Sequence, residues 1–188
     1  MIDQPRLLSV NLATERSVRH RGREVRTGIY KEPTGGRVRL RTLGLEGDFQ
    51  ADPSVHGGPD KAVYVYPSEH YSYFRELLNR PDLSAGFFGE NFTTEGLLED
   101  GVSPGDVLRI GTAVVQVTTP RSPCFKLAAK AGSPAFIGAF LNSRRLGFYL
   151  SVLEEGNVGA GDPVQRISPA AGERTLAGLI ERRYFRAR

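Results

Sequence analysis

Three arginines alternate with apolar residues in one short stretch of this chain. Arg37, Arg39 and Arg41 are separated by Val38 and Leu40. Because successive side chains of a strand point to opposite faces, this pattern predicts a half-buried strand over residues 37–43 with its arginines on the solvent side. Further short apolar runs predict strands at residues 7–12, 62–66, 106–110, 113–118, 148–153 and 164–167.

Turn and capping residues separate these runs. Gly111 and Thr112 form a two-residue connection that predicts a β-hairpin. Ser68 is expected to cap a helix, and Ser122 and Ser133 are each followed by proline, which suits the first helical position. Glycines are expected to end two of the helices and to form a turn over residues 156–161. The helix terminators expected are Gly132 and Gly147.

Many short strands and few short helices predict a mainly β domain of the α+β class, closed like a barrel, rather than a doubly wound sheet. With 188 residues the chain can bury one sizeable core. We therefore expect one domain over residues 1–167, followed by a linker and one short basic helix in residues 168–188. The N-terminus lacks a secretory or membrane-spanning apolar segment, so we expect a cytoplasmic protein without membrane contact.

Charge is distributed unevenly along the chain. Residues 15–41 carry nine Arg or Lys and three Asp or Glu, whereas residues 42–99 carry three and ten. A basic segment attracts nucleic acid, an anionic membrane or a phosphorylated small molecule, and it can equally be a solvated arginine-rich face. Nucleic-acid binding is the least favoured of these interpretations, since Tyr30 is the segment's only aromatic residue.

Cys124 is the single cysteine. A single cysteine excludes an intramolecular disulfide and a zinc site with several cysteines. The three histidines form no HExxH motif. A helix capped by Ser122 would place Cys124 in its first turn, near Arg121 and Lys126. This setting would lower the thiol pKa and prepare the sulfur as a nucleophile or a soft metal ligand. The alternative is a small buried apolar side chain.

A second cluster of chemically active residues occupies residues 47–61. Asp48, Asp52 and His56 recur every fourth residue, but proline and glycine between and after them disfavour the helix that a shared metal site would need. We favour an anion-binding loop, in which the Gly57-Gly58 backbone approaches the ligand and Lys61 supplies a cation. In such a loop, His56 would donate to a phosphate or carry a proton. An ordinary glycine turn is the alternative.

Several motifs together resemble the MOSC domain family, and specifically its YiiM-like branch. The resemblance runs from about residue 8 to residue 167, and its specificity lies in the order and spacing of the motifs. They are Thr27-Gly28-Ile29-Tyr30-Lys31, Gly47-Asp48, His56-Gly57-Gly58-Pro59-Asp60-Lys61-Ala62-Val63, Tyr66-Pro67, Gly89-Glu90-Asn91-Phe92, Gly105-Asp106 and Pro120-Arg121-Ser122-Pro123-Cys124.

The resemblance implies a MOSC-type β-barrel that binds a molybdenum-pterin cofactor (Mo-molybdopterin), with Cys124 coordinating the molybdenum. It implies an oxidoreductase that reduces small N-hydroxylated substrates such as 6-hydroxylaminopurine to amines. The electrons would come from a separate flavoprotein or ferredoxin-type protein. In such a site the cofactor carries the redox chemistry, and the protein sets its position and electrostatic surroundings.

Each predicted site residue has a role in this interpretation. The cofactor's phosphate would meet Lys31, Gly57, Gly58, Lys61 and Arg121, and the pterin would accept or donate hydrogen bonds at Thr27 and Asn91. Asp48 and His56 would either line the open side of the metal, as catalytic residues beside Cys124, or only order the loop. The corresponding residues are read from the matching motifs of this sequence.

YiiM-like proteins typically end in a small three-helix domain that would shape substrate access or dock an electron donor, whereas residues 168–188 leave room for one helix. The same pocket would also serve a non-catalytic cofactor carrier or a sulfur-transfer module, because a shared fold does not establish activity. The sequence does not indicate an oligomeric state.

Overall fold

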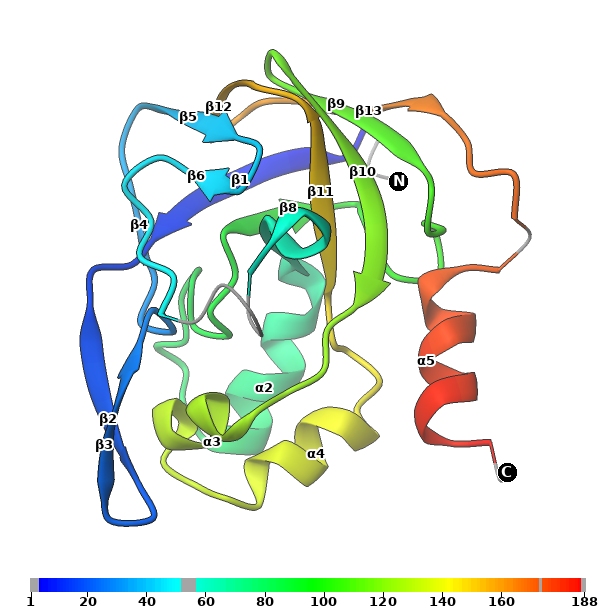
Figure 1. Cartoon of the computed structure of the whole chain (residues 1–188). Helices are drawn as coiled ribbons and strands as arrows, with labels where there is room; N and C mark the ends of the chain where they lie inside the picture. The colour runs from blue at the N-terminus through cyan, green and yellow to red at the C-terminus, as the bar shows by residue number, and fades with distance from the viewer. Residues whose placement is uncertain (1–3, 52–56, 173, 187–188) are drawn as a thin grey trace.

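The structure is a computed structural model that describes residues 4–51, 57–172 and 174–186 (Figure 1). Strands dominate it, and the described residues contain four short α-helices. The predicted site residue His56 and its neighbour Asp52 lie outside the described residues, so the three-residue metal site considered for residues 48–56 has no structural test here.

The main sheet has eight strands, in the order β13-β9-β10-β11-β7-β8-β1-β4. Neighbouring strands are antiparallel except β7 and β8, which are parallel. The strands are β1 (Arg6–Leu12), β4 (Glu32–Pro33), β7 (Val63–Pro67), β8 (Phe92–Glu95), β9 (Val107–Ile110), β10 (Ala113–Pro120), β11 (Phe148–Glu154) and β13 (Val164–Ser168). The turn at Gly111 and Thr112 joins β9 to β10, as predicted.

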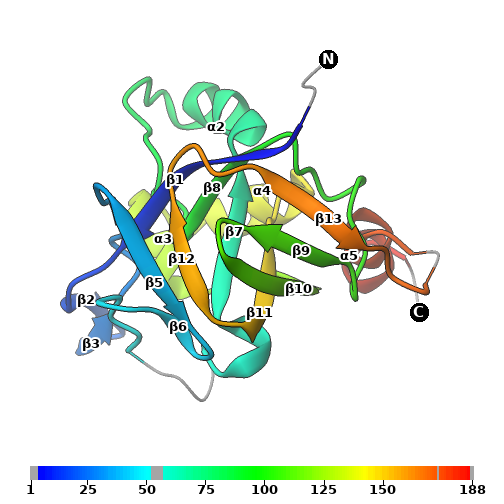
Figure 2. The same cartoon turned by 90° about the horizontal axis from the view of Figure 1, so that it is seen from above.

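A three-stranded sheet lies beside the main one, as the view from above shows (Figure 2). It consists of β12 (Gly156–Gly159), β5 (Arg37–Arg41) and β6 (Gly44–Leu45). The alternation in β5 is confirmed, because Leu40 is buried and Arg37 and Arg41 are exposed. The expected turn over residues 156–161 is wrong in part: β12 is a strand. A Cβ at Gly156 would collide with the backbone of the β9–β10 turn, so only glycine allows this close packing.

A separate hairpin, which the sequence did not predict, is formed by β2 (Arg16–His20) and β3 (Arg23–Thr27). Its alternation of apolar and charged residues is weak, and Val18 is its main buried apolar side chain. In Figure 1 it extends beyond the sheets, and β2 contacts the helix that follows Cys124.

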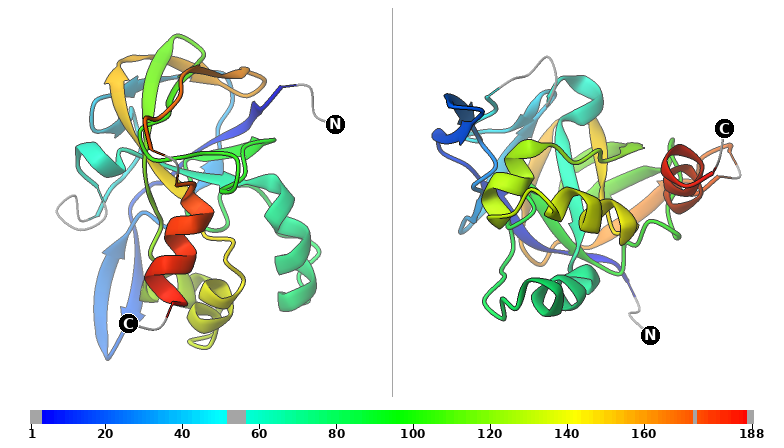
Figure 3. Two further views of the ribbon diagram at one scale, coloured as in Figure 1. Left: turned by 90° about the vertical axis from the view of Figure 1, so that its right-hand side faces the viewer. Right: turned by 90° about the horizontal axis from the view of Figure 1, so that it is seen from below.

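The helices are α2 (Tyr71–Leu78), α3 (Phe125–Ala131), α4 (Phe136–Asn142) and α5 (Leu176–Tyr184), with 3₁₀ turns η1 (Pro59–Lys61) and η2 (Ser68–His70). In Figures 1 and 3, α4 lies between α3 and α5 below the main sheet. The helix over residues 175–185 is confirmed, and the Thr175 side chain caps it by accepting from the Gly178 N–H. Among the described residues, no helix combines the length and apolar character needed to span a membrane.

The three expected serine caps are wrong. Ser68 begins the turn η2, and α2 starts three residues later. The Ser122 hydroxyl is hydrogen-bonded to the Tyr184 hydroxyl of α5 instead of a helix N–H, at 2.6 Å. The Ser133 N–H donates to the Ala128 carbonyl, so this residue closes α3 and does not open α4.

One glycine terminator is confirmed and the other is wrong. Gly132 ends α3 with a positive φ of 74°. Gly147 also has a positive φ, but it follows α4 by several residues and leads into β11. Its N–H donates to the buried Glu99 carboxylate at 2.8 Å. A Cβ there would collide with the Val65 carbonyl, so glycine is required by packing between strands and not by the end of a helix.

The interior has two apolar clusters. The first is aliphatic and lies within the strands; the second is aromatic and lies between the main sheet and the helices, with Tyr66, Phe74, Phe88 and Phe140 at its centre. Helix α5 contributes Leu176 to the first cluster and Ile180 to the second. The proposed domain boundary near residue 167 stays a prediction.

The mainly β, α+β class is confirmed by this element content. Within the described residues, β13 and β4 are the two edge strands of the main sheet, and no pairing between them closes it. Closure into a barrel therefore stays a prediction. The region most relevant to function is the one where β7, β10 and β11 meet the loop before α3. Several charged residues from distant parts of the chain gather there.

Candidate functional site

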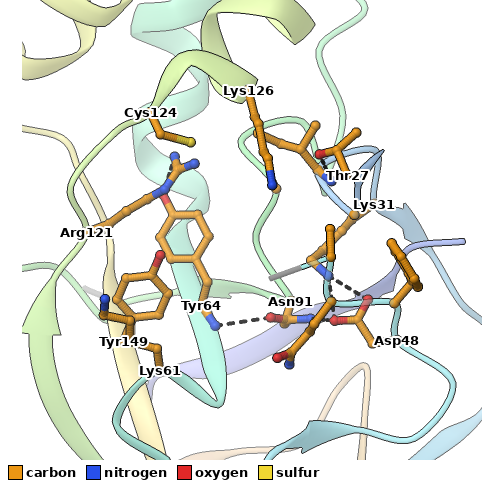
Figure 4. Close-up of a pocket in the computed structure, with 16 residues that line it drawn as sticks. Thr27, Lys31, Asp48, Lys61, Tyr64, Asn91, Arg121, Cys124, Lys126 and Tyr149 are labelled. Atoms are coloured by element: carbon orange, nitrogen blue, oxygen red, sulfur yellow. Dashed lines mark hydrogen bonds and ion pairs between the residues drawn. The ribbon is translucent and has the colours of Figure 1, made fainter. Parts of the chain in front are cut away.

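A pocket beside the start of α3 contains most of the predicted site residues (Figure 4). The space between its walls is about 610 Å³, a volume that includes the part open to solvent. Of its lining side chains, four are cationic and one is a carboxylate. The predicted residues that line it are Thr27, Lys31, Asp48, Lys61, Asn91, Arg121 and Cys124.

Cys124 is positioned by the backbone on both sides of it. Strand β10 ends at Pro120, and the Arg121 N–H donates to the Gly147 carbonyl at 3.1 Å. Cys124 then has an extended conformation as the N-cap of α3, and its half-buried side chain lines the pocket. The expectation that Cys124 lies within the first helical turn is therefore wrong by two residues, because the turn starts only after it.

Arg121 is a buried cation without a carboxylate partner among the described residues. Only 5% of its surface is exposed. The guanidinium lies 4.6 Å from the centre of the Tyr64 ring and donates to the Tyr64 hydroxyl at 3.4 Å. Burial alone lowers its pKa, but the nearby ionisable Tyr64, Tyr149 and Cys124 together raise the pKa above its ordinary value. The group therefore stays charged.

Lys126 is a second such cation, in the first turn of α3. Its exposed fraction is 9%, and within the described part of the chain it has no ion pair or side-chain hydrogen bond. In Figure 4 its amine points into the same space as Arg121 and Cys124. Keeping a cation buried without an opposite charge is costly, so these two residues point to an anionic ligand.

Asp48 lies on the opposite wall in a closed network. Its carboxylate is within 2.5 Å of the Lys31 amine and accepts from the Ala13 N–H and the Asn91 amide, both at 2.8 Å. Its side chain is 1% exposed, and that of Lys31 is 8% exposed. Burial lowers the pKa of Lys31, and the Asp48 charge opposes this effect. These contacts favour the second interpretation of Asp48, in which it orders the loop.

Asn91 and Thr27 line the pocket but are also hydrogen-bonded inside the protein. The Asn91 side-chain oxygen accepts from the Tyr64 N–H at 3.2 Å, while its amide donates to Asp48. The Thr27 hydroxyl accepts from the Ile29 N–H at 3.1 Å. Both side chains hold the pocket walls in place. Their predicted contact with a pterin stays a prediction.

Lys61 reaches the pocket because the turn η1 precedes β7 directly. Gly58 begins that turn with a positive φ of 83°, and its carbonyl accepts from the Lys61 N–H at 3.1 Å. Gly57 and Gly58 themselves are not among the described residues that line the pocket. Gly58 sets the turn that presents Lys61. The predicted contact of Gly57 and Gly58 with a phosphate stays a prediction. His56 lies outside the described residues.

Sequence reasoning missed three contributors to the site. Lys126 was noted only as a charge near Cys124, and Tyr64 and Tyr149 were placed in strands with no further role. Both tyrosines lie against Arg121, and burial raises the pKa of each. In the sequence, these two tyrosines cannot be distinguished from ordinary core aromatics, because the apolar runs around them are typical of buried strands.

Lys130 lies behind the pocket and illustrates the excess of positive charge. Its amine donates to the carbonyls of Ile29 and Gly86 at 2.9 and 2.7 Å. Burial, together with the charges of Lys31 and Arg121, lowers its pKa to about 8, while Glu90 opposes the shift. Lys130 thus adds a further basic group close behind the pocket.

Comparison with known proteins agrees with this picture. The model of the MOSC domain family matches residues 52–165. The protein YiiM of Escherichia coli (strain K12) is 42% identical over 144 residues, which are 76% of this chain and 64% of that protein. A protein named reductase from Gibberella moniliformis is 36% identical over 76% of this chain, but the match covers only 26% of its own length.

Among solved structures, the crystal structure of YiiM from Geobacillus stearothermophilus superposes with a TM-score of 0.79 at 36% identity. The match covers 94% of this chain and 82% of that one. The family match spans more than half of the chain, and the structural match spans nearly all of it. The chain belongs to the MOSC domain family, in its YiiM-like branch.

Proposed function

We propose that this protein binds a molybdenum-pterin cofactor in the Cys124 pocket and reduces N-hydroxylated compounds to amines. One observation carries the proposal: Arg121 and Lys126 are buried beside Cys124 and have no carboxylate partner among the described residues. An anion with a soft metal attached would use all three groups at once. The sulfur would bind the metal, and the cations would neutralise the anionic part.

The donor set fits such a cofactor. Cys124 is the single thiol of the chain, and it lies in the pocket wall rather than in the core. The cations Arg121 and Lys126 suit a phosphate, and the network of Asp48, Lys31 and Asn91 keeps the opposite wall rigid. A preorganised cationic pocket avoids the cost of rearranging the protein when the anion binds.

The reaction is a two-electron reduction. The N–O bond of R–NHOH breaks, two electrons and two protons are taken up, and the products are R–NH₂ and water. When bound, the cofactor supplies this redox chemistry, and a reduced flavoprotein or ferredoxin-type protein supplies the electrons. The chain's own residues hold the cofactor, keep its charge balanced, and exclude water from the wall formed by Tyr64 and Tyr149.

A non-catalytic carrier would use the same pocket, so binding alone does not separate the two functions. The name of the Gibberella relative, reductase, favours the enzyme. We keep reduction as the proposal, with 6-hydroxylaminopurine as its test substrate.

The test measures molybdenum and turnover together. The wild type and Cys124→Ala would be purified from cells that make the cofactor, and molybdenum per chain would be determined. Reduction of 6-hydroxylaminopurine would then be followed with a chemically reduced flavin as donor. Ser84→Ala is the control, since Ser84 is exposed and does not line the pocket.

We expect metal and activity in the wild type and the control, and neither in Cys124→Ala. A wild type without molybdenum would contradict the proposal. Molybdenum without turnover would instead identify a carrier.

A further inference from the structure

The loop that carries Cys124 lies outside the helices and strands. It runs from Arg121 to Cys124, between the end of β10 and the start of α3. Both of its ends are held by backbone hydrogen bonds, whereas Ser122 and Pro123 between them have none to another described residue. A loop held only at its ends keeps conformational freedom in its middle. Its position therefore depends on what the side chains of this middle part contact.

Helix α5 supplies such a contact. The Ser122 and Tyr184 hydroxyls are hydrogen-bonded at 2.6 Å, although the two residues are 62 positions apart in the chain. The Tyr184 ring is half-buried and packs against the aromatic cluster, so its hydroxyl reaches the loop from a fixed base. We call this hydrogen bond the hydroxyl brace.

The helix behind the brace is itself held at both ends. At its start, the Leu176 N–H donates to the Val102 carbonyl at 2.8 Å. Toward its end, the Glu181 carboxylate lies 2.7 Å from Arg144. The guanidinium of Arg144 also lies 4.0 Å from the centre of the Phe185 ring. Tyr184 is therefore presented by a helix whose place on the protein is fixed without the brace.

Glu99 connects the brace to the other support of the loop. Its buried carboxylate accepts from the Gly147 N–H, and the Gly147 carbonyl accepts from the Arg121 N–H at the start of the loop. The Glu99 carbonyl accepts from the Ala177 N–H of α5 at 2.9 Å. One buried residue thus supports the loop from its β11 side and also holds the helix that carries the brace.

Around the brace, α5 does not pack closely on the chain that leads into the loop. The helix lies beside the end of β10 (Figure 1), but a hollow separates the two. Its described lining residues are Thr119, Pro120, Leu179, Arg182 and Arg183. Because this part of the contact is open, the brace joins the loop to α5 by a hydrogen bond and not as part of a packed interface.

We infer that Tyr184 is a positioning residue for the metal-binding sulfur. Its hydroxyl holds Ser122, and through Ser122 it keeps the half-buried Cys124 side chain in the pocket wall. The inference rests on the proposed function for the role of the sulfur as a metal ligand. Without the brace, the loop opens more often, the sulfur is more accessible to solvent, and the metal is held less tightly.

A set of hydroxyl variants tests the brace. Tyr184→Phe and Ser122→Ala each remove one of the two hydroxyls, and the double variant removes both. Ser122→Thr keeps a hydroxyl at the same position. Tyr73→Phe is the matched control, because it removes the same atom from an exposed tyrosine on α2, outside the loop and α5.

Three measurements are made on each full-length protein. Cys124 is the single thiol, so its alkylation by iodoacetamide can be followed by the mass of the intact chain. The alkylation rate is taken on the cofactor-free protein, and the rate of molybdenum release is taken on the loaded protein. Chemical denaturation gives the fraction of chains that are unfolded under the same conditions.

We expect alkylation to be about fivefold faster in Tyr184→Phe and in Ser122→Ala, a factor that corresponds to the net contribution of one hydrogen bond. The double variant should match the single variants, because the second hydroxyl has no partner left to lose. Molybdenum release should accelerate by a similar factor. Ser122→Thr and Tyr73→Phe should stay within about twofold of the wild type. The unfolded fraction should be too small to account for the faster alkylation.

Three results would overturn the inference. The first is unchanged alkylation in both single variants. The second is a double variant whose effect is the product of the two single effects, because the two hydroxyls would then act separately. The third is alkylation that follows the unfolded fraction, because it would report loss of the fold and not opening of the loop.

The cofactor-free measurement separates this inference from the proposed function. If the wild type contains no molybdenum but the variants show the expected alkylation pattern, the positioning of the sulfur stands and the proposed function fails. If the wild type holds molybdenum and reduces 6-hydroxylaminopurine while alkylation and molybdenum release are the same in all variants, the positioning inference fails alone.

Discussion

Two sets of basic residues in this protein have opposite surroundings. On strand β5, each arginine has a carboxylate partner: Arg37 lies 2.9 Å from Asp162, and Arg39 and Arg41 lie within 3.7 Å of Glu155. In the pocket, Arg121 and Lys126 are buried, and no carboxylate of the described residues pairs with them. The β5 arginines are thus satisfied by the protein itself, while the pocket cations are not. Partnering and burial, rather than the density of basic residues, indicate where an anion binds.

The largest effect is expected where a buried cation loses its partner. In Asp48→Asn, the Lys31 amine would keep its burial but lose the carboxylate 2.5 Å away. We expect the free energy of unfolding to fall by ~3 kcal/mol, as for other broken buried ion pairs. Chemical denaturation at neutral pH measures it. In Asp48→Asn with Lys31→Met, most of the loss should be recovered, and a double variant as unstable as the single one would contradict this account.

Lys126 is buried without a carboxylate partner among the described residues, so we expect its replacement to affect cofactor binding and not stability. Lys126→Met should not lower the free energy of unfolding of the cofactor-free protein, because it removes an uncompensated buried charge. The same change should weaken cofactor binding about tenfold, the worth of one charged hydrogen bond. Pterin fluorescence titration and denaturation give the two values. If the variant is destabilised and binds normally, Lys126 is structural and the contrast between the two sets disappears.

The smallest effect is expected on β5. Arg39→Ala removes an ion pair whose two side chains are 40% and 33% exposed. The free energy of unfolding should change by less than about 1 kcal/mol, and molybdenum content should stay at the wild-type level. The measurement is the same denaturation series, repeated at high salt, where the difference from wild type should shrink further. A loss of cofactor in Arg39→Ala would contradict this account, because it would show that the β5 arginines also contribute to the binding site.

The sequence predicted the strands that carry strong apolar runs, because burial of one face leaves a readable period. It missed the hairpin β2–β3, whose residues are mostly charged and exposed, and β12, whose Gly156 is required by close backbone contacts with a distant turn. Such contacts join segments far apart in the chain. A single sequence contains no local pattern that reports them.

The sequence predicted the site in part, as it did the fold. Cys124, Lys31, Asp48, Lys61 and Arg121 do line one pocket, and the motifs that brought them together came from a family resemblance and not from local patterns. The helix caps were misassigned because serine followed by proline fits a helix start, while here Ser122 and Ser133 are hydrogen-bonded elsewhere. Tyr64 and Tyr149 could not be found, since their role depends on Arg121 reaching them from another strand end.

Helix α5 places Leu176 in the aliphatic core and Ile180 in the aromatic one, only a single turn apart. During synthesis, neither core can be completed until these residues have left the ribosome. Until α5 is synthesised, the nascent chain would therefore carry two incomplete apolar surfaces, a state that chaperones recognise. Since Tyr184 of the same helix is hydrogen-bonded to Ser122, the loop that carries Cys124 would also gain its final support only then. Cofactor insertion would on this account follow the docking of α5.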